Sequence, residues 1–191
     1  MSKRTIEKNL FCLPWTQTIL GTVRDGRPNF MALDWVTRVN FNPPLLGICV
    51  NKNHASAEAV RKNGEFSVNV PTVDMVEVTD YTGLVSGRNA DKSRLFEVFA
   101  GSLAHAPLIA SCPINIECSL LQTLEFATNN FFIAEIVNIH VEESVLTNGK
   151  PDMSKVRPFL LTMPDNTYWS VGQPVGKAWQ AGQAMRDRLK Q

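Results

Sequence analysis

No apolar run in this 191-residue chain approaches the length of a membrane-spanning helix. A helix needs about 20 consecutive apolar residues to cross a bilayer. The first residues also lack the apolar segment of a secretory signal. The formal net charge is +1 and there is no long basic run, which argues against nucleic-acid binding. We therefore expect a cytoplasmic protein that binds neither membranes nor nucleic acids.

Cysteine and histidine are too few and too scattered to predict a metal site. The four cysteines, Cys12, Cys49, Cys112 and Cys118, form no Cys-x-x-Cys pair, and the three histidines add no close spacing. Zinc sites use such close spacings. Cys49 lies in the apolar run 45–50, where a thiol usually behaves as a small hydrophobic side chain. We expect no bound metal and no structural disulfide, since disulfides are rare in the cytoplasm.

The familiar motifs of nucleotide-dependent and hydrolytic enzymes are also missing. No Gly-x-Gly-x-x-Gly follows a predicted strand, so no built-in nicotinamide-dinucleotide domain is expected. Residues 172–178 resemble a phosphate-binding P-loop, but the motif is one residue short and has Ala178 where serine or threonine would hold magnesium. There is no Gly-x-Ser-x-Gly motif, and the scattered histidines do not support a catalytic triad. No catalytic residue is therefore assigned.

The chain does have the composition of a globular protein and many predicted strands. Hydrophobic residues make up 44% and charged residues 19% of the sequence, which suits a protein with a substantial core. Apolar patterns and turn signals predict strands at 16–23, 29–39, 45–50, 65–70, 114–126, 131–141, 157–163 and 167–171, and helices at 54–62, 72–81, 91–99 and after Pro174. An antiparallel sheet closed into a small barrel removes many strand edges. We predict one domain, residues 1–191, mainly β with peripheral helices.

The last predicted helix has an apolar face that must be covered. Pro174 suits the first turn of a helix. The apolar face repeats at helical spacing and contains Val175, Ala178, Trp179, Gly182, Met185 and Leu189. The helix could cover either the core of its own chain or a boundary between subunits.

A first polar segment, residues 29–35, offers a place for a flat ring. The small side chain of Ala32 would let a ring approach the backbone, and Trp35 would supply an aromatic wall. The alternative is that Trp35 is simply a core aromatic residue.

A second segment, residues 51–56, leaves a buried strand and enters a helix. A helix start presents unpaired N–H groups and a partial positive charge, which suits a phosphate. Ser56 adds a hydroxyl group, and Lys52 and His54 add positive or proton-donating groups. The alternative is that His54 or Ser56 merely caps the helix.

A third segment, residues 86–92, is a glycine-bearing turn with two cations. The alternative is a solvated loop in which Asp91 caps the following helix. Together the three segments offer phosphate donors and a planar-ring site, which are the requirements of a mononucleotide cofactor.

Over most of its length the chain resembles the flavin reductase-like FMN-binding proteins, and within them the flavoredoxin group. The most specific motifs are Asn-x-Met-Ala-x-x-Trp at 29–35 and Ser-Gly-Arg-x-x-Asp-Lys at 86–92. Further similar segments are 42–45, 64–71, 106–109, 115–118, 132–136 and 168–172. The resemblance implies an FMN-binding split β-barrel that forms a homodimer, with FMN near the subunit interface.

The resemblance also implies a set of cofactor-binding residues. Those expected around the isoalloxazine ring are Asn29, Met31, Ala32 and Trp35; those at the phosphate and ribityl end are Lys52, His54 and Ser56; those that close the site are Ser86, Gly87 and Lys92. Asn129 stands where flavoredoxins can carry a histidine, which weakens any proton-donating role at that position.

Three functions fit these residues. The protein could be an NAD(P)H-dependent flavin or ferric reductase that turns over alone. It could instead carry electrons between protein partners, for example from a ferredoxin-like donor. It could also be a passive FMN-binding or structural protein. FMN brings its own redox chemistry, which explains why the sequence shows no nucleophile.

Overall fold

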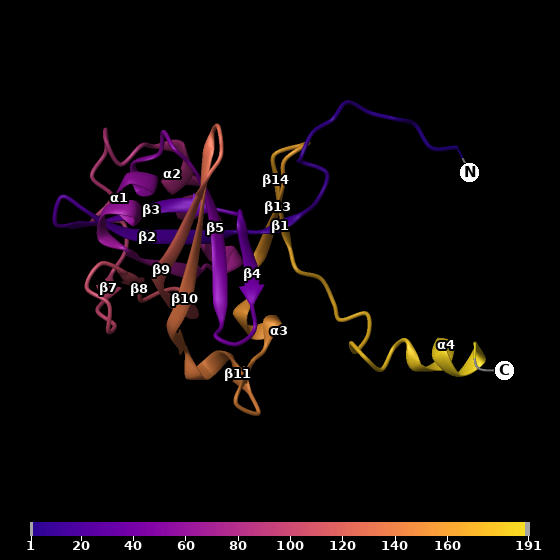
Figure 1. Cartoon of the computed structure of the whole chain (residues 1–191). Helices are drawn as coiled ribbons and strands as arrows, with labels where there is room; N and C mark the ends of the chain where they lie inside the picture. Colours follow the sequence, from indigo (N-terminus) through magenta and orange to yellow (C-terminus); the bar gives the residue numbers. More distant parts are fainter. Residues whose placement is uncertain (1, 190–191) are drawn as a thin grey trace.

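A seven-stranded antiparallel sheet, ordered β3-β2-β6-β9-β10-β5-β4, forms the body of the protein. The computed structural model describes residues 2–189; Met1 and residues 190–191, which belong to the predicted single domain, lie outside the described residues. The strands of this sheet are β2 (Thr18–Arg24), β3 (Arg27–Leu33), β4 (Val36–Asn40), β5 (Leu45–Asn51), β6 (Glu65–Val70), β9 (Ile114–Glu125) and β10 (Asn129–Val141). The strands β3 and β4 are its two edges (Figure 1).

Smaller elements surround this sheet. A three-stranded sheet contains β1 (Trp15–Thr16), β13 (Phe159–Thr162) and β14 (Thr167–Ser170), and two short ladders contain β7 (Val98–Phe99) with β8 (Leu108–Ile109) and β11 (Leu146–Thr147) with β12 (Lys150–Pro151). The helices are α1 (Ala55–Asn63), α2 (Val76–Leu84), α3 (Met153–Val156) and α4 (Gln183–Arg188), with single turns η1 (Val73–Met75) and η2 (Glu143–Val145). The architecture is mainly β with peripheral helices, as predicted.

Local sequence explains the ends of several elements. Asp25 and Gly26 have positive φ values of 50° and 74°, the backbone that a two-residue hairpin turn between β2 and β3 requires. Gly64, with a φ of 68°, ends α1 in the left-handed conformation, and its N–H donates to the Val60 carbonyl. These two turns therefore set the end of β2 and the end of α1.

The core lies inside the curved sheet. Its largest cluster includes Leu20, Ile48, Phe66, Val68 and Phe132, which come from four different strands. Their side chains are at most 1% exposed. The helix α1 adds Ala57 and Val60 to the same cluster and so closes one side of it. Burial of this apolar surface is the main force that holds the strands together.

Two predicted elements are wrong in detail. The strand expected at 29–39 is two strands, because the chain turns at Asp34–Trp35 and passes from one edge of the sheet to the other. The helix expected at 91–99 is absent. Its residues form turns and then β7, because Lys92 is held by backbone carbonyls and Phe96 packs edge-on against Phe30 at 5.0 Å.

The predicted C-terminal helix is also much shorter than expected. Between Pro174 and residue 189, Gln183–Arg188 is the one helical stretch, and the preceding residues 171–182 contain no helix or strand. Both terminal segments leave the body on the same side (Figure 1). Gly176 and Gly182 weaken a helix here, and in a single chain no surface covers its apolar face, so propensity alone cannot extend it.

Among residues 2–189, no helix has the length and apolar character needed to cross a membrane.

Candidate functional site

A cleft of about 380 Å³ lies between the β2–β3 turn and the loop at 86–92. Three elements form it: the start of β3, the 86–92 loop, and the end of β2. The residues that line it are Arg24, Asp25, Arg27, Pro28, Asn29, Gly87, Arg88, Asn89, Ala90, Asp91 and Lys92. Two of the three polar segments predicted from the sequence therefore meet at this cleft, and the third, at the start of α1, adjoins it through Asn29 and Arg88.

Asn29 joins the elements beneath the cleft. Its buried side-chain amide donates to Oγ1 of Thr22 at 3.2 Å and to Oγ of Ser56 at 3.1 Å. A Cβ on Gly87 would lie only 2.1 Å from Oδ1 of Asn29, so the 86–92 loop can rest on Asn29 only because residue 87 is glycine. The structure thus brings together Asn29, Ser56 and Gly87, three of the residues that the resemblance assigns to the cofactor site.

Lys92 is a buried cation at the same place. Its side chain is 3% exposed, and its Nζ donates to the carbonyls of Phe30 at 3.0 Å and Thr82 at 2.7 Å. Among the described residues no carboxylate pairs with it. Burial lowers the pKa of Lys92 to about 8 from its ordinary value of 10.5. Such a charge is compensated only by neutral carbonyls, and an anionic ligand would stabilise it further.

The start of α1 adds positive potential beside Lys92. His54 occupies the position before the first helical residue, and its side chain makes no capping hydrogen bond. Burial lowers the pKa of His54, and the nearby charges of Lys92 and Arg88 lower it further. The first N–H groups of a helix have no intrahelical acceptor and carry a partial positive charge. The region therefore attracts anions.

Three arginines at the cleft were not among the predicted site residues. The guanidinium group of Arg24 donates to the Gly87 carbonyl at 2.8 Å, and that of Arg27 pairs with Asp91 at 3.1 Å. Arg88 donates to the Asn53 carbonyl and contacts the Glu58 carboxylate at 3.4 Å. Two of these arginines flank the Asp25-Gly26 turn. This pair of arginines could have been noticed in the sequence. The sequence, however, predicts the turn alone and does not show that the 86–92 loop lies opposite it.

Lys52 and Ser86 lie at the margins of the site. The ammonium group of Lys52 is partly exposed and lies 3.7 Å from the Glu125 carboxylate. The hydroxyl of Ser86 accepts a hydrogen bond from the N–H of Arg88 at 3.2 Å and so shapes the loop. Neither residue has a hydrogen bond to Asn29, Ser56 or Lys92 among the described residues.

The residues expected around a flavin ring are spread over different surfaces. Met31 lies in the main core cluster, and Ala32 points to the other face of β3, where a Cβ on Gly83 would lie 3.2 Å from it. Trp35 lines a separate apolar pocket of about 270 Å³ together with Cys49 and Phe131. Of the four residues expected around the ring, Trp35 is the one that offers an aromatic wall.

A polar contact links this apolar pocket to Asn129. Burial raises the pKa of the Cys49 thiol, while a hydrogen bond with the Asn129 side chain partly offsets the effect. Asn129 pairs with Asn51 across β10 and β5, directly before the residues that lead to α1. Through β5 and its pairing with β10, the pocket with Trp35 and Cys49 is therefore joined to the residues that lead to α1.

These residues fit a flavin mononucleotide. Among the described strands β3 pairs only with β2, and its Phe30 carbonyl already accepts from Lys92, so the remaining outer backbone groups of this edge are available to a planar ring. The donor set at the charged side consists of a buried ammonium group, arginines and a helix start, which is suited to a phosphate.

The similarity of the chain to known proteins agrees with this geometry. A family model described as the flavin reductase like domain matches residues 10–163. A crystal structure of flavoredoxin from Methanosarcina acetivorans is 51% identical and covers 97% of this chain and 100% of that chain, with a TM-score of 0.94. For the flavoredoxin of Desulfovibrio vulgaris (Miyazaki F) the identity is 31%, the coverage 95% and 100%, and the TM-score 0.87.

A curated relative carries an enzyme name. An FMN reductase (NADH) of Ancylobacter novellus is 29% identical over 119 residues, which are 60% of this chain and 61% of that protein. These similarities confirm the predicted resemblance and the mainly β split-barrel fold class, and they agree with FMN as the cofactor.

Proposed function

Because the chain belongs to the flavin reductase like domain family, we propose that it binds FMN and passes electrons between a reduced donor and an acceptor. The observation that carries the proposal is Lys92, a buried cation that the described residues hold by two carbonyl oxygens beside a helix start. Two flavoredoxins among the solved structures, one of them 51% identical, support the same function.

In this proposal different residues of the chain bind different parts of the cofactor. The start of α1, with Lys52, His54 and Ser56, binds the phosphate and ribityl end. Ser86 and Gly87 close the site through their loop. The edge of β3 and the side chain of Trp35 hold the ring plane.

FMN supplies hydride and single-electron chemistry when bound, so the chain needs no nucleophile of its own. The chain's task is electrostatic. Lys92 holds a positive charge at a fixed point beside Phe30 on β3. Such a preorganised charge stabilises negative charge that develops nearby during reduction.

The identity of the electron donor distinguishes the two candidate functions, an electron carrier and a reductase. The greater similarity to flavoredoxins favours a carrier that meets a ferredoxin-like protein, and the relative named FMN reductase (NADH) favours the second candidate, a reductase that uses NAD(P)H. The chain has no dinucleotide-binding motif, so NAD(P)H would dock only transiently on the ring.

Spectroscopy and stopped-flow kinetics test the proposal. The purified protein should be yellow and release FMN, not FAD, on denaturation. Mixing with reduced ferredoxin should reduce the flavin rapidly, while NADH and NADPH should reduce it slowly. Rapid reduction by NADH or NADPH would instead establish the reductase. Colourless protein that excess FMN cannot reconstitute would refute both, and a bound flavin that neither donor reduces would leave a passive binding protein.

The proposal also includes a cytoplasmic homodimer. Several apolar side chains on the β9–β10 hairpin are exposed in a single chain: Leu121, Leu124, Phe126, Val137 and Ile139. Large exposed apolar patches on a soluble protein usually mark interaction sites. A second copy of the chain would cover such side chains.

A further inference from the structure

Asp34 lies at the connection between β3 and β4 and lines the apolar pocket of about 270 Å³ that contains Trp35. Among the described residues that line this pocket, Asp34 alone carries a charge, and its neighbours include Cys49 and Phe131. Backbone hydrogen bonds of 3.0 Å fix the connection, from the Val36 N–H to the Asp34 carbonyl and from the Cys49 N–H to the Trp35 carbonyl. The fold therefore holds an acid at the wall of an apolar pocket.

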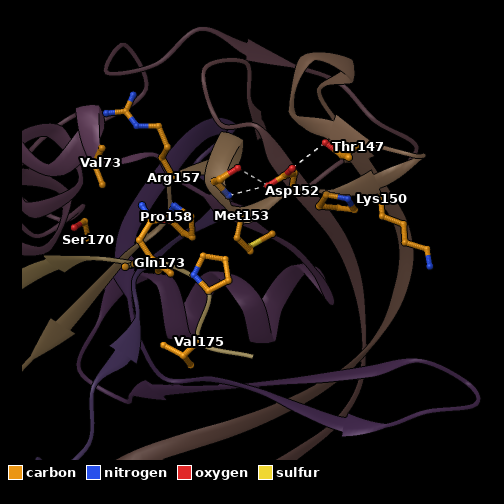
Figure 2. A pocket seen from close by; sticks show the side chains of 15 residues that line it. Val73, Thr147, Lys150, Asp152, Met153, Arg157, Pro158, Ser170, Gln173 and Val175 are labelled. Carbon is orange, nitrogen blue, oxygen red and sulfur yellow. Dashed lines mark hydrogen bonds between the residues drawn. The ribbon is translucent and has the colours of Figure 1, made fainter. Parts of the chain in front are cut away.

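Two other acids of the chain show how a carboxylate is usually compensated. In the groove of about 960 Å³ beside α3, Figure 2 shows Asp152, whose carboxylate accepts from the Thr147 hydroxyl at 2.8 Å and from the Ser154 N–H at 3.0 Å. The carboxylate of the fully buried Glu117 lies 2.9 Å from Nε2 of His140. Contacts of this kind stabilise the ionised form of a carboxyl group.

The half-buried side chain of Asp34 has no such partner among residues 2–189. None of the ion pairs of the described residues includes it. Burial raises the pKa of Asp34 above its ordinary value of 3.8, and a hydrogen bond from its own backbone N–H offsets this only in part. Asp34 therefore binds a proton more readily than an exposed aspartate does.

The titratable groups that face Asp34 come from β5, β14 and α2. Tyr168 of β14 donates to the Asp80 carboxylate of α2 at 2.7 Å. Burial, this hydrogen bond and the negative charges of Asp80 and Asp34 raise the pKa of Tyr168. Burial also raises the pKa of the Cys49 thiol of β5. Tyr168 and Cys49 therefore stay protonated at neutral pH, and Asp34 is the residue lining the pocket that can gain or lose a proton.

We propose that Asp34 takes up a proton when the bound flavin is reduced. This inference rests on the proposed function, in which Trp35, the next residue of the chain, holds the ring plane. Two electrons from the donor and one solvent proton leave the reduced ring with one negative charge. The Asp34 carboxylate then accepts a second solvent proton at Oδ, which forms an O–H bond and removes its own charge. The reason is electrostatic, because a like charge that develops beside a half-buried carboxylate favours its neutral form.

The coupling sets how the reduction equilibrium depends on pH. Above the pKa that Asp34 has in the reduced protein, the carboxylate stays ionised and its charge opposes reduction. Between the pKa values of the two redox states, each unit of falling pH relieves this opposition by up to about tenfold. Below the pKa of the oxidised protein, Asp34 is neutral in both states and has no effect.

Redox equilibration of the FMN-loaded full-length protein with a reference dye, from about pH 5 to about pH 9, tests the coupling. Asp34→Asn keeps the shape of the side chain and removes its charge. At about pH 8 it should favour the reduced form at least about tenfold over the native chain, and the advantage should shrink as the pH falls. The control Asp187→Asn, at an exposed acid of α4, should match the native chain at every pH. Circular dichroism should show the same fold in all three proteins.

A second measurement needs no substitution. Carbon-13 NMR of the aspartate carboxyl groups gives the pKa of Asp34 in the apoprotein and in both redox states of the FMN-loaded protein. The pKa should be raised in the apoprotein and should rise further on reduction.

The outcomes separate this inference from the proposed function. An equal pKa in the two redox states, or a pH dependence that Asp80→Asn abolishes and Asp34→Asn keeps, would overturn the role of Asp34 and leave the proposed function standing. A protein that binds no FMN, although its Asp34 has a raised pKa, would overturn the proposed function and the redox coupling together.

Discussion

At the scale of single residues, the electrostatics of the site depend most on the buried ammonium group of Lys92. A buried ammonium group is costly unless a charge compensates it, and here two carbonyls do so only in part. The depressed pKa of about 8 measures that cost. A bound phosphate or reduced flavin would complete the compensation, so cofactor affinity should depend on this side chain more than on the exposed lysines.

Replacement of Lys92 by methionine should weaken FMN binding by roughly ten- to a hundredfold. Hydrogen bonds to a charged group contribute about 1.5–3 kcal/mol, and each 1.4 kcal/mol is a tenfold change in affinity. Methionine keeps the apolar stem in the buried position. Fluorescence titration of the apoprotein with FMN measures the effect, and Lys150→Ala, at an exposed lysine, is the control. Unchanged affinity and unchanged flavin potential in the Lys92 variant would remove this residue from the site.

The affinity for FMN should fall as the pH rises above about 8. The pKa of Lys92 in the unliganded protein is lowered to about 8. Below that pH the ammonium form is ready to bind the anion; above it, binding must include uptake of a proton, so affinity declines by up to about tenfold per pH unit. Titrations between pH 7 and about 10 test this. The Lys92→Met variant should lose the decline, and a decline that survives in this variant would assign it to another group.

At the scale of elements, the site depends on the 86–92 loop resting on β3. That contact requires glycine at position 87, because any Cβ would collide with the Asn29 side chain. Asn29 in turn holds Ser56 at the start of α1. Movement of the loop therefore disturbs all three elements around the cleft.

Substitution of Gly87 by alanine should lower FMN affinity at least tenfold while most of the fold remains. The added methyl group displaces either the loop or Asn29, and misplacement of a binding loop costs affinity without removing any charge. Gly172→Ala is the matched control, because nothing lies within 4 Å of a Cβ at that position. Equal FMN affinity in the two variants would show that the loop is not part of the site.

At the scale of the whole molecule, the proposed cofactor site and the proposed dimer are coupled. If FMN lies near the subunit interface, as the resemblance implies, it stabilises the dimer by binding to it in preference to the monomer. Light scattering and sedimentation at micromolar concentration should show a dimer with FMN bound, and removal of FMN should raise the dimer dissociation constant. A dimer whose stability is the same with and without FMN would place the cofactor away from the interface.

Local signals in the sequence determined the strands, the hairpins and much of the site. Alternating residues predicted β6, and Asp-Gly and Asn-Gly predicted the turn after β2 and the end of α1, because these depend on neighbours in the chain. Motifs at 29–35 and 86–92 identified Asn29, Gly87 and Lys92, which the structure brings together. These residues were identified from the types and order of the side chains in the two motifs, without knowledge of their contacts in the fold.

Features that depend on contacts between residues far apart in the sequence were decided only by the tertiary structure. Residues 91–99 are not helical because Lys92 is held by carbonyls of β3 and α2, elements that lie earlier in the chain. Met31 faces the core and Ala32 the opposite surface, a choice set by the register of β3 against β2. The same register brings Arg24 and Arg27 to the cleft. Helical spacing predicted a long C-terminal helix, but a helix of that composition forms only where a surface covers its apolar face, and one chain alone does not supply that surface.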